Sequence, residues 1–166
     1  YMYRAATETL DSAQTDEQKE RARDQLKAAF LVFTKLGKAE WTSAGLMAKL
    51  KSFKVLVALD KPKTARKYLE ELTPPVQGDR AYGLYWLLKG ELDFGDGKYR
   101  DSMQGAVNSL CFETKDIDTF PDALLLSAQC YEEMQEWHRA QDVYYEVARI
   151  FPDTDWSELA VRRLHF

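Results

Sequence analysis

The residues that could do chemistry are few and scattered along the 166-residue sequence. Its two histidines, His138 and His165, have no partner at the H-x-x-x-H spacing that helical zinc sites use. The run Phe94-Gly95-Asp96-Gly97 has the glycines of a phosphate-binding loop, but no strand precedes it and no Gly-Lys-Ser/Thr follows. It is typical of a helix end and turn instead. The sequence therefore predicts no metal ligands and no cofactor.

Adjacent carboxylates come closest to an acid–base couple. Glu70-Glu71 and Glu132-Glu133 are sequence neighbours on predicted helices. Successive helical side chains point about 100° apart, so neither pair faces one another. No G-x-S-x-G pattern and no P-loop occurs. The sequence predicts a protein that is not an enzyme and has no catalytic residue; the alternative is an active site assembled from distant helices.

The two cysteines, Cys111 and Cys130, do not form a C-x-x-C pair. Both are among apolar residues in predicted helices, which favours buried free thiols and leaves a disulfide between them open. The four tryptophans fall at predicted helix starts and turns. We expect them to anchor packing between helices, with ligand stacking as the alternative for Trp41 and Trp156: Trp41, Trp86, Trp137 and Trp156.

The composition favours a globular helical protein. Hydrophobic residues make up 45%, and only 8 glycines and 5 prolines interrupt the chain. The net charge of −4 disfavours a nucleic-acid binder. No apolar run approaches the roughly 20 residues of a membrane span.

Charge is distributed unevenly along the sequence. Acidic residues dominate between Glu113 and Glu158. Between positions 49 and 67, Asp60 is the sole acidic residue against Lys49, Lys51, Lys54, Lys61, Lys63, Arg66 and Lys67. We expect opposite potentials at the two ends of the molecule. These are either solvated helix faces or a polar rim that orients a charged partner.

Residues 123–152 show the clearest periodicity. Apolar or small residues recur at helical spacing on both sides of the polar stretch Glu132–Glu136, and Pro152 follows the second series. This predicts two amphipathic helices joined by a tight turn. The positions that define the two series are Leu124, Ala128, Tyr131, Trp137, Ala140, Tyr144, Val147 and Ala148.

This segment resembles a tetratricopeptide repeat, whose pattern is W-x2-L-G-x2-Y, then A-x3-F, then P. Ser127 replaces the leucine of that pattern. The other positions are taken by Leu124, Ala128, Tyr131, Ala140, Tyr144 and Pro152. Small Ala128 and Ala140 would let the two helices approach closely, while the two tyrosines fill the surrounding space.

Weaker copies of the pattern precede this segment. One contains Trp86, Gly90 and the turn Gly97-Lys98-Tyr99, with Asp93, Ser102 and Ala106 as replacements. Another has the turn Asp60-Lys61-Pro62, followed by Ala65, Leu69 and Leu72. Its first helix is expected over Thr42–Leu59, with Phe53 where a small residue is usual. A first pair is expected from helices at Met2–Asp11 and within Asp16–Leu36, on the positions Ala22, Leu26 and Ala29.

The resemblance implies an all-α fold, a right-handed superhelical solenoid of about four helical hairpins plus a C-terminal capping helix. We expect one domain, 1–166, with hairpins at about 1–37, 40–73, 80–114 and 120–152. Asp155-x-x-Glu158 is interpreted as a capping box that opens the final helix, 155–166. Because the sequence begins at Tyr1 rather than Met, we expect a fragment of a longer protein. A helical solenoid of another repeat class is the alternative.

In the tetratricopeptide family the first helix of each hairpin lines a concave groove that binds a peptide or helix. The corresponding positions form an apolar stripe with a few charged or amide groups. For Leu87 and Leu125 the alternative is burial between hairpins. The expected groove residues, called the first-helix stripe below, are Leu50, Lys54, Val57, Leu87, Glu91, Phe94, Leu125, Gln129 and Glu132.

The resemblance implies a non-enzymatic scaffold for protein–protein interaction, binding a peptide or helix of another protein. With Asn108 as its single asparagine, the chain lacks the carboxylate clamp of chaperone receptors. The alternative is a structural spacer or oligomerisation module of a longer solenoid, and a homo-oligomer is left open. Residues 149–164 are similar to bacterial cell-envelope tetratricopeptide proteins, namely the outer-membrane assembly lipoprotein and the periplasmic partner of the Tol–Pal system. This slightly favours the bacterial envelope over the cytoplasm.

Overall fold

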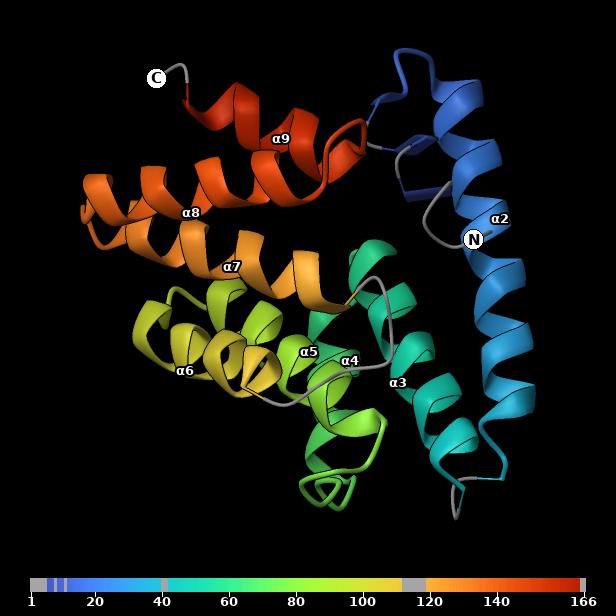
Figure 1. Ribbon diagram of the computed structural model, residues 1–166. Coiled ribbons are helices and arrows are strands. Elements are labelled where there is room, and N and C mark those ends of the chain that lie inside the picture. Colours follow the sequence, from blue (N-terminus) through green and yellow to red (C-terminus); the bar gives the residue numbers. More distant parts are fainter. Residues whose placement is uncertain (1–5, 8, 11, 40–41, 112–118, 165–166) are drawn as a thin grey trace. The chain divides into compact units, whose positions relative to one another are not determined.

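The computed structural model describes residues 6–7, 9–10, 12–39, 42–111 and 119–164, and all regular elements within these ranges are helices (Figure 1). The chain divides into two compact units, Tyr1–Thr73 (unit 1) and Pro74–Phe166 (unit 2). The predicted all-α fold is confirmed. The superhelical path and the single domain over 1–166 stay predictions.

Unit 1 contains three consecutive described helices, in which α2 packs on α3 and α3 packs on α4. Unit 2 contains five more, and each packs on the next in sequence. The bounds in unit 1 are α2 (Asp16–Leu36), α3 (Ser43–Ala58) and α4 (Pro62–Glu70). Those in unit 2 are α5 (Ala81–Gly95), α6 (Tyr99–Leu110), α7 (Thr119–Glu133), α8 (Trp137–Ile150) and α9 (Asp155–Leu164).

Some expected segments fall on residues outside the described ranges. These are residues 1–5, 8 and 11 of the first hairpin, 40–41 of the second, 112–114 of the third and 165–166 of the final helix. Residues 6, 7, 9, 10 and 12 are helical, as the expected helix over Met2–Asp11 requires for its described part. Among the described helices, none is long and apolar enough to cross a bilayer.

Side-chain caps explain where several helices begin. At α2, Thr15 Oγ1 accepts a hydrogen bond from Gln18 N at 3.2 Å, and Gln18 Oε1 accepts one from Thr15 N at 3.2 Å. At α9 the cap is Thr154, whose Oγ1 accepts from Ser157 N at 3.3 Å. The interpretation of Asp155 and Glu158 as a capping box was therefore wrong by one residue. Both carboxylates lie in the first turn of α9, where their negative charge interacts favourably with the helix dipole.

The same turn closes three hairpins, α3–α4, α5–α6 and α7–α8. In each, one residue adopts a left-handed conformation, with φ of 59° at Asp60, 74° at Gly97 and 62° at Gln135. The following N–H then donates to a carbonyl five residues earlier, as in a Schellman motif. These bonds are Lys61 N to Leu56 O (2.9 Å), Lys98 N to Asp93 O (2.9 Å) and Glu136 N to Tyr131 O (2.8 Å). The three hairpins are therefore local copies of one design.

Small residues let the helices of unit 2 approach closely. A Cβ at Gly105 would lie 2.8 Å from Gly90 Cα and 2.8 Å from Trp86 O, so α5 and α6 touch backbone to backbone. In the next hairpin, Ala128 and Ala140 are both buried in one cluster with Tyr144. The expected burial of these two small residues with Tyr144 agrees with this cluster. Gly105, the second half of the α5–α6 contact, was not foreseen from the sequence.

Two expectations about buried side chains were wrong. Trp137 is 57% exposed, so it does not anchor packing between helices. Cys111 is exposed, while Cys130 is buried as expected, and both are free thiols. Trp156 does anchor α9, because its Nε1 donates to Asp122 at 2.7 Å and its ring lies 5.9 Å from that of Phe151. Trp41 lies outside the described residues.

Candidate functional site

The first-helix stripe lies on the first helix of each hairpin that shares the turn described above. Within unit 2, α5 and α7 are in contact although α6 separates them in sequence. The stripe positions of α5 and α7 therefore lie on adjacent helices. The α3 positions belong to unit 1.

The three leucines of the stripe are core residues. Leu50, Leu87 and Leu125 are all buried, and Leu125 belongs to the cluster around Ala128 and Tyr144. A partner could not reach these side chains without opening the core. This matches the alternative given above for Leu87 and Leu125.

The remaining stripe residues of α5 and of the middle of α7 are half-buried. Phe94 packs against the cluster that contains Leu87 and Cys130, and its ring meets that of Tyr99 edge-on at 5.3 Å. Glu91 and Gln129 add a carboxylate and an amide on these adjacent helices. The pair α5–α7 thus offers one aromatic and two polar side chains that a partner can contact.

Glu132 has a structural task in this unit. Its Oε2 accepts a hydrogen bond from Tyr144 on α8 at 2.8 Å, and its Oε1 accepts one from Arg163 on α9 at 3.1 Å. Burial of the Tyr144 phenol, and then its hydrogen bond to Glu132, raise the pKa of Tyr144 well above its ordinary value of 10.0. Glu132 therefore connects α7 to both α8 and α9, and its two carboxylate oxygens already accept hydrogen bonds within the chain.

In unit 1 the stripe is represented by Lys54 and Val57 on α3, both half-buried, beside buried Leu50. Their i, i+3 spacing puts them on one face of the helix. They offer a cation and a small apolar surface. This face is the unit 1 counterpart of the α5–α7 positions.

An ion pair on α5 with a buried carboxylate was not foreseen from the sequence. Asp93 is buried, and its Oδ2 lies 2.9 Å from Lys89 Nζ. The Lys89 ammonium also lies 5.9 Å from the centre of the Trp86 ring. The i, i+4 spacing of Lys89 and Asp93 is the signal that could have found it. The pair stiffens the helix that presents Glu91 and Phe94.

The shifted titratable groups are held in their neutral forms. Burial raises the pKa of the Cys130 thiol and of the Tyr85 phenol. A hydrogen bond with Glu133 raises the pKa of Tyr99. Among the described residues, no group of three His, Cys, Asp or Glu side chains is placed to hold a metal ion.

Comparison with known families identifies one segment. Residues 122–154 match the family model described as tetratricopeptide repeat, and this range contains α8 and nearly all of α7. The recognition of a tetratricopeptide repeat at the fourth hairpin is confirmed. No curated protein and no solved structure matches the chain significantly. The likeness of residues 149–164 to bacterial cell-envelope proteins stays a prediction.

Proposed function

We propose that this chain is a non-enzymatic scaffold that binds a peptide or helix of another protein along the first helices of its hairpins. The tetratricopeptide repeat at 122–154 supports a role in protein–protein interaction. The groove assignment goes beyond that family match. It rests on the exposure and placement of particular side chains.

The observation that carries the proposal is the adjacency of α5 and α7. Phe94, Glu91 and Gln129 are half-exposed on helices that touch each other, above a core closed by Leu87 and Leu125. Rigid, well-packed helices hold these side chains in fixed positions, which lowers the entropy lost on binding. An apolar ring, with a carboxylate on the same helix and an amide on the adjacent helix, suits a segment that brings an apolar residue and hydrogen-bond donors.

The test is a selection from a random-peptide display library against the intact chain, followed by affinity measurement on the enriched peptides. The stripe variant combines Glu91→Lys with Gln129→Lys. We expect it to weaken binding of stripe-directed peptides by about tenfold or more, because the partner then meets two new cations. Phe94→Ala should weaken the same peptides, and Lys54→Glu tests the α3 position.

The matched control makes the same chemical changes on a second helix. Glu146→Lys and Gln141→Lys alter exposed residues of α8 and should leave affinity within about twofold. Circular dichroism melting verifies that both double variants remain folded. If every enriched peptide binds the stripe variant, the Phe94→Ala variant and the parent chain equally well, the groove assignment is refuted.

The alternative function is a structural spacer or oligomerisation module. It is favoured by the outer face of α2, where Leu31, Val32 and Leu36 are all more than half exposed. Sedimentation over a range of concentrations distinguishes the two roles. Self-association that Leu31→Glu abolishes would support the oligomerisation module, whereas a strict monomer argues against it.

A further inference from the structure

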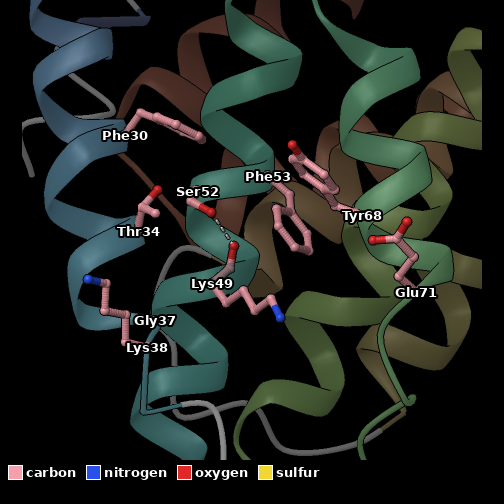
Figure 2. Close-up of a pocket in the computed structure, with 9 residues that line it drawn as sticks. All are labelled: Phe30, Thr34, Gly37, Lys38, Lys49, Ser52, Phe53, Tyr68 and Glu71. Atoms are coloured by element: carbon pink, nitrogen blue, oxygen red, sulfur yellow. Dashed lines mark hydrogen bonds between the residues drawn. The ribbon is translucent and has the colours of Figure 1, made fainter.

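A pocket in unit 1 is independent of the first-helix stripe. It has a volume of about 480 Å³ and is lined by residues of α2, α3 and α4 and of the segment after α2. Figure 2 shows Phe53 and Tyr68 side by side, with Phe30 pointing from α2 toward α3 and the Lys49 side chain extending below the Phe53 ring. None of the nine stripe residues lines it. Its size falls in the range typical of ligand-binding clefts.

Phe53 distinguishes the hairpin of this pocket from the other two. In the shared turn geometry, position 53 of α3 corresponds to Gly90 of α5 and Ala128 of α7, each twelve residues before the first small residue of the second helix. Where the residue is small, the two helices close on each other. Here the Phe53 ring is buried and meets the Tyr68 ring at 5.7 Å. Phe53 and Tyr68 thus pack on each other between α3 and α4, and both line the pocket.

The pocket is bounded by a close helix contact and by a partly exposed ring. A Cβ at Gly37 would lie 3.2 Å from Lys49 Cα, so the segment that follows α2 lies directly on α3. Tyr68 lines the pocket and is 40% exposed. An aromatic wall that is partly exposed and rigidly backed is the usual setting for an apolar anchor side chain of a partner.

The charged residues that line the pocket are two lysines, Lys38 and Lys49, and one glutamate. Two of its walls, α3 and α4, come from the basic stretch between positions 49 and 67. Glu71 is the one carboxylate among the lining residues, and its Oε1 lies 4.0 Å from Lys67 Nζ. The surroundings therefore attract negative charge, and repel a basic partner.

We propose that this pocket binds a bulky apolar side chain carried by an acidic peptide segment of a partner protein. The aromatic walls take the apolar side chain, and Lys38 pairs with a carboxylate next to it in the peptide. The site is separate from the first-helix stripe. Peptide binding at the pocket does not depend on whether the first-helix stripe binds a partner.

The test uses the intact chain and a random-peptide display library, with counter-selection on a pocket variant that combines Tyr68→Ala and Lys38→Glu. The retained peptides should be rich in Asp and Glu around a Phe, Trp, Leu or Ile. Their affinity should fall about tenfold or more in the pocket variant, and should weaken as salt rises.

The matched control combines Tyr145→Ala with Lys19→Glu, an exposed tyrosine on α8 and an exposed lysine in α2 away from the pocket. It should leave affinity within about twofold. The stripe variant Glu91→Lys with Gln129→Lys should also leave these peptides unaffected, which separates this site from the proposed groove. Melting curves verify that each variant is folded.

Three results would overturn the proposal. They are retention of no peptide after counter-selection, retained peptides without excess acidic residues, and equal binding to the pocket variant. A fourth arm uses 3-phenylpropionate, a free aromatic carboxylate. If it binds as tightly as the peptides and depends equally on Tyr68, the pocket is a small-molecule site and the peptide assignment is wrong.

Discussion

The hairpins α3–α4 and α5–α6 share one turn geometry, but the residue in the middle of the first helix differs greatly in size between them. In α5 it is Gly90, where a Cβ would already lie 2.9 Å from Leu126 Cδ2 and 3.0 Å from Ser102 O. In α3 it is Phe53, whose ring packs on Tyr68. The hairpin α3–α4 accordingly has a pocket beside α3, whereas α5–α6 is closed. A large side chain at this position accompanies the pocket beside α3, and glycine accompanies the tight helix contact of α5–α6.

The two units differ in charge as well as in packing. Residues 1–73 carry 14 Lys and Arg against 10 Asp and Glu, whereas residues 74–166 carry 9 against 17. Unit 1 is therefore basic and unit 2 acidic. A basic unit with a pocket and an acidic unit with tightly packed hairpins would select different partners.

The largest effect on stability should come from placing phenylalanine, the residue at position 53 of unit 1, at the corresponding position 90 of unit 2. Gly90→Phe forces a benzyl group against the backbone of α6, so we expect a loss of about 4 kcal/mol or more in the free energy of unfolding. Urea denaturation measures it. Thiol labelling of Cys130 should also accelerate, because Cys130 Sγ lies 3.1 Å from Ser102 Oγ on α6.

Gly95→Ala is the control for that change. No atom lies within 4 Å of a Cβ at Gly95, and its φ is not left-handed. The variant should remain within about 1 kcal/mol of the parent, on the stabilising side. Parent-like stability of Gly90→Phe would show that the closed contact is not required.

The reciprocal change should be the next largest. Phe53→Ala removes a buried ring that packs on Tyr68 between α3 and α4, so we expect a loss of about 3 kcal/mol, measured by urea denaturation. Tyr68→Ala removes a more exposed ring from the same contact and should cost less. A loss below about 1 kcal/mol for Phe53→Ala would show that this ring does not support the hairpin.

Tyr144→Phe should cost about 1.5 kcal/mol, because it removes a hydrogen bond to the charged Glu132. Chemical denaturation at neutral pH measures the loss. Tyr145→Phe is the control on the same helix, since Tyr145 is largely exposed and should change little. Equal stability of the two variants would contradict the role given to Glu132.

The same phenol should make stability depend on alkaline pH. Burial raises the pKa of Tyr144 in the folded state above its ordinary value of 10.0. Its contribution is therefore fully present below pH 10 and is lost as the pH rises above that value toward the folded-state pKa. Denaturation at pH 9 and pH 11 should show a smaller drop for Tyr144→Phe than for the parent chain, and an identical drop would contradict the assignment.

The smallest effects should distinguish the ion pairs of the two units. Arg163 and Glu132 join residues 31 apart in sequence, with side chains 44% and 26% exposed. Arg21 and Glu17 are neighbours on α2 and are 76% and 75% exposed. We expect Arg163→Met to cost about 0.5 kcal/mol and Arg21→Gln less than about 0.3 kcal/mol in thermal melts. The reverse order would contradict this comparison.

Local patterns predicted the helices better than the surfaces. The helix Asp16–Leu36 and the turns at Asp60 and Gly97 follow from caps, periodicity and turn residues close together in sequence. Glu132 had the spacing of a groove residue, but spacing could not show that Tyr144 and Arg163 would reach it from two later helices.

The pocket could not be predicted for the same reason. Phe53 was noted as an unusual residue in its position, but the cavity also requires Phe30 and Tyr68 from two other helices. By contrast, Trp156-x2-Leu159-Ala160 repeats in α9 the spacing of Leu124, Ser127 and Ala128 in α7. Ala160 is completely buried against the same cluster as Ala128, and this spacing was the sequence signal that α9 packs like the first helix of a repeat.

The left-handed turn residues also show where foreign sequence can enter this chain. Asp60, Gly97 and Gln135 are three different residue types in one backbone conformation, and all three are exposed. The turns therefore tolerate different residue types at these positions, and the hydrogen bonds that close them join backbone atoms on either side. A protease recognition site or a short reporter tag grafted at each tip would let the opening of each hairpin be followed by cleavage, one hairpin at a time.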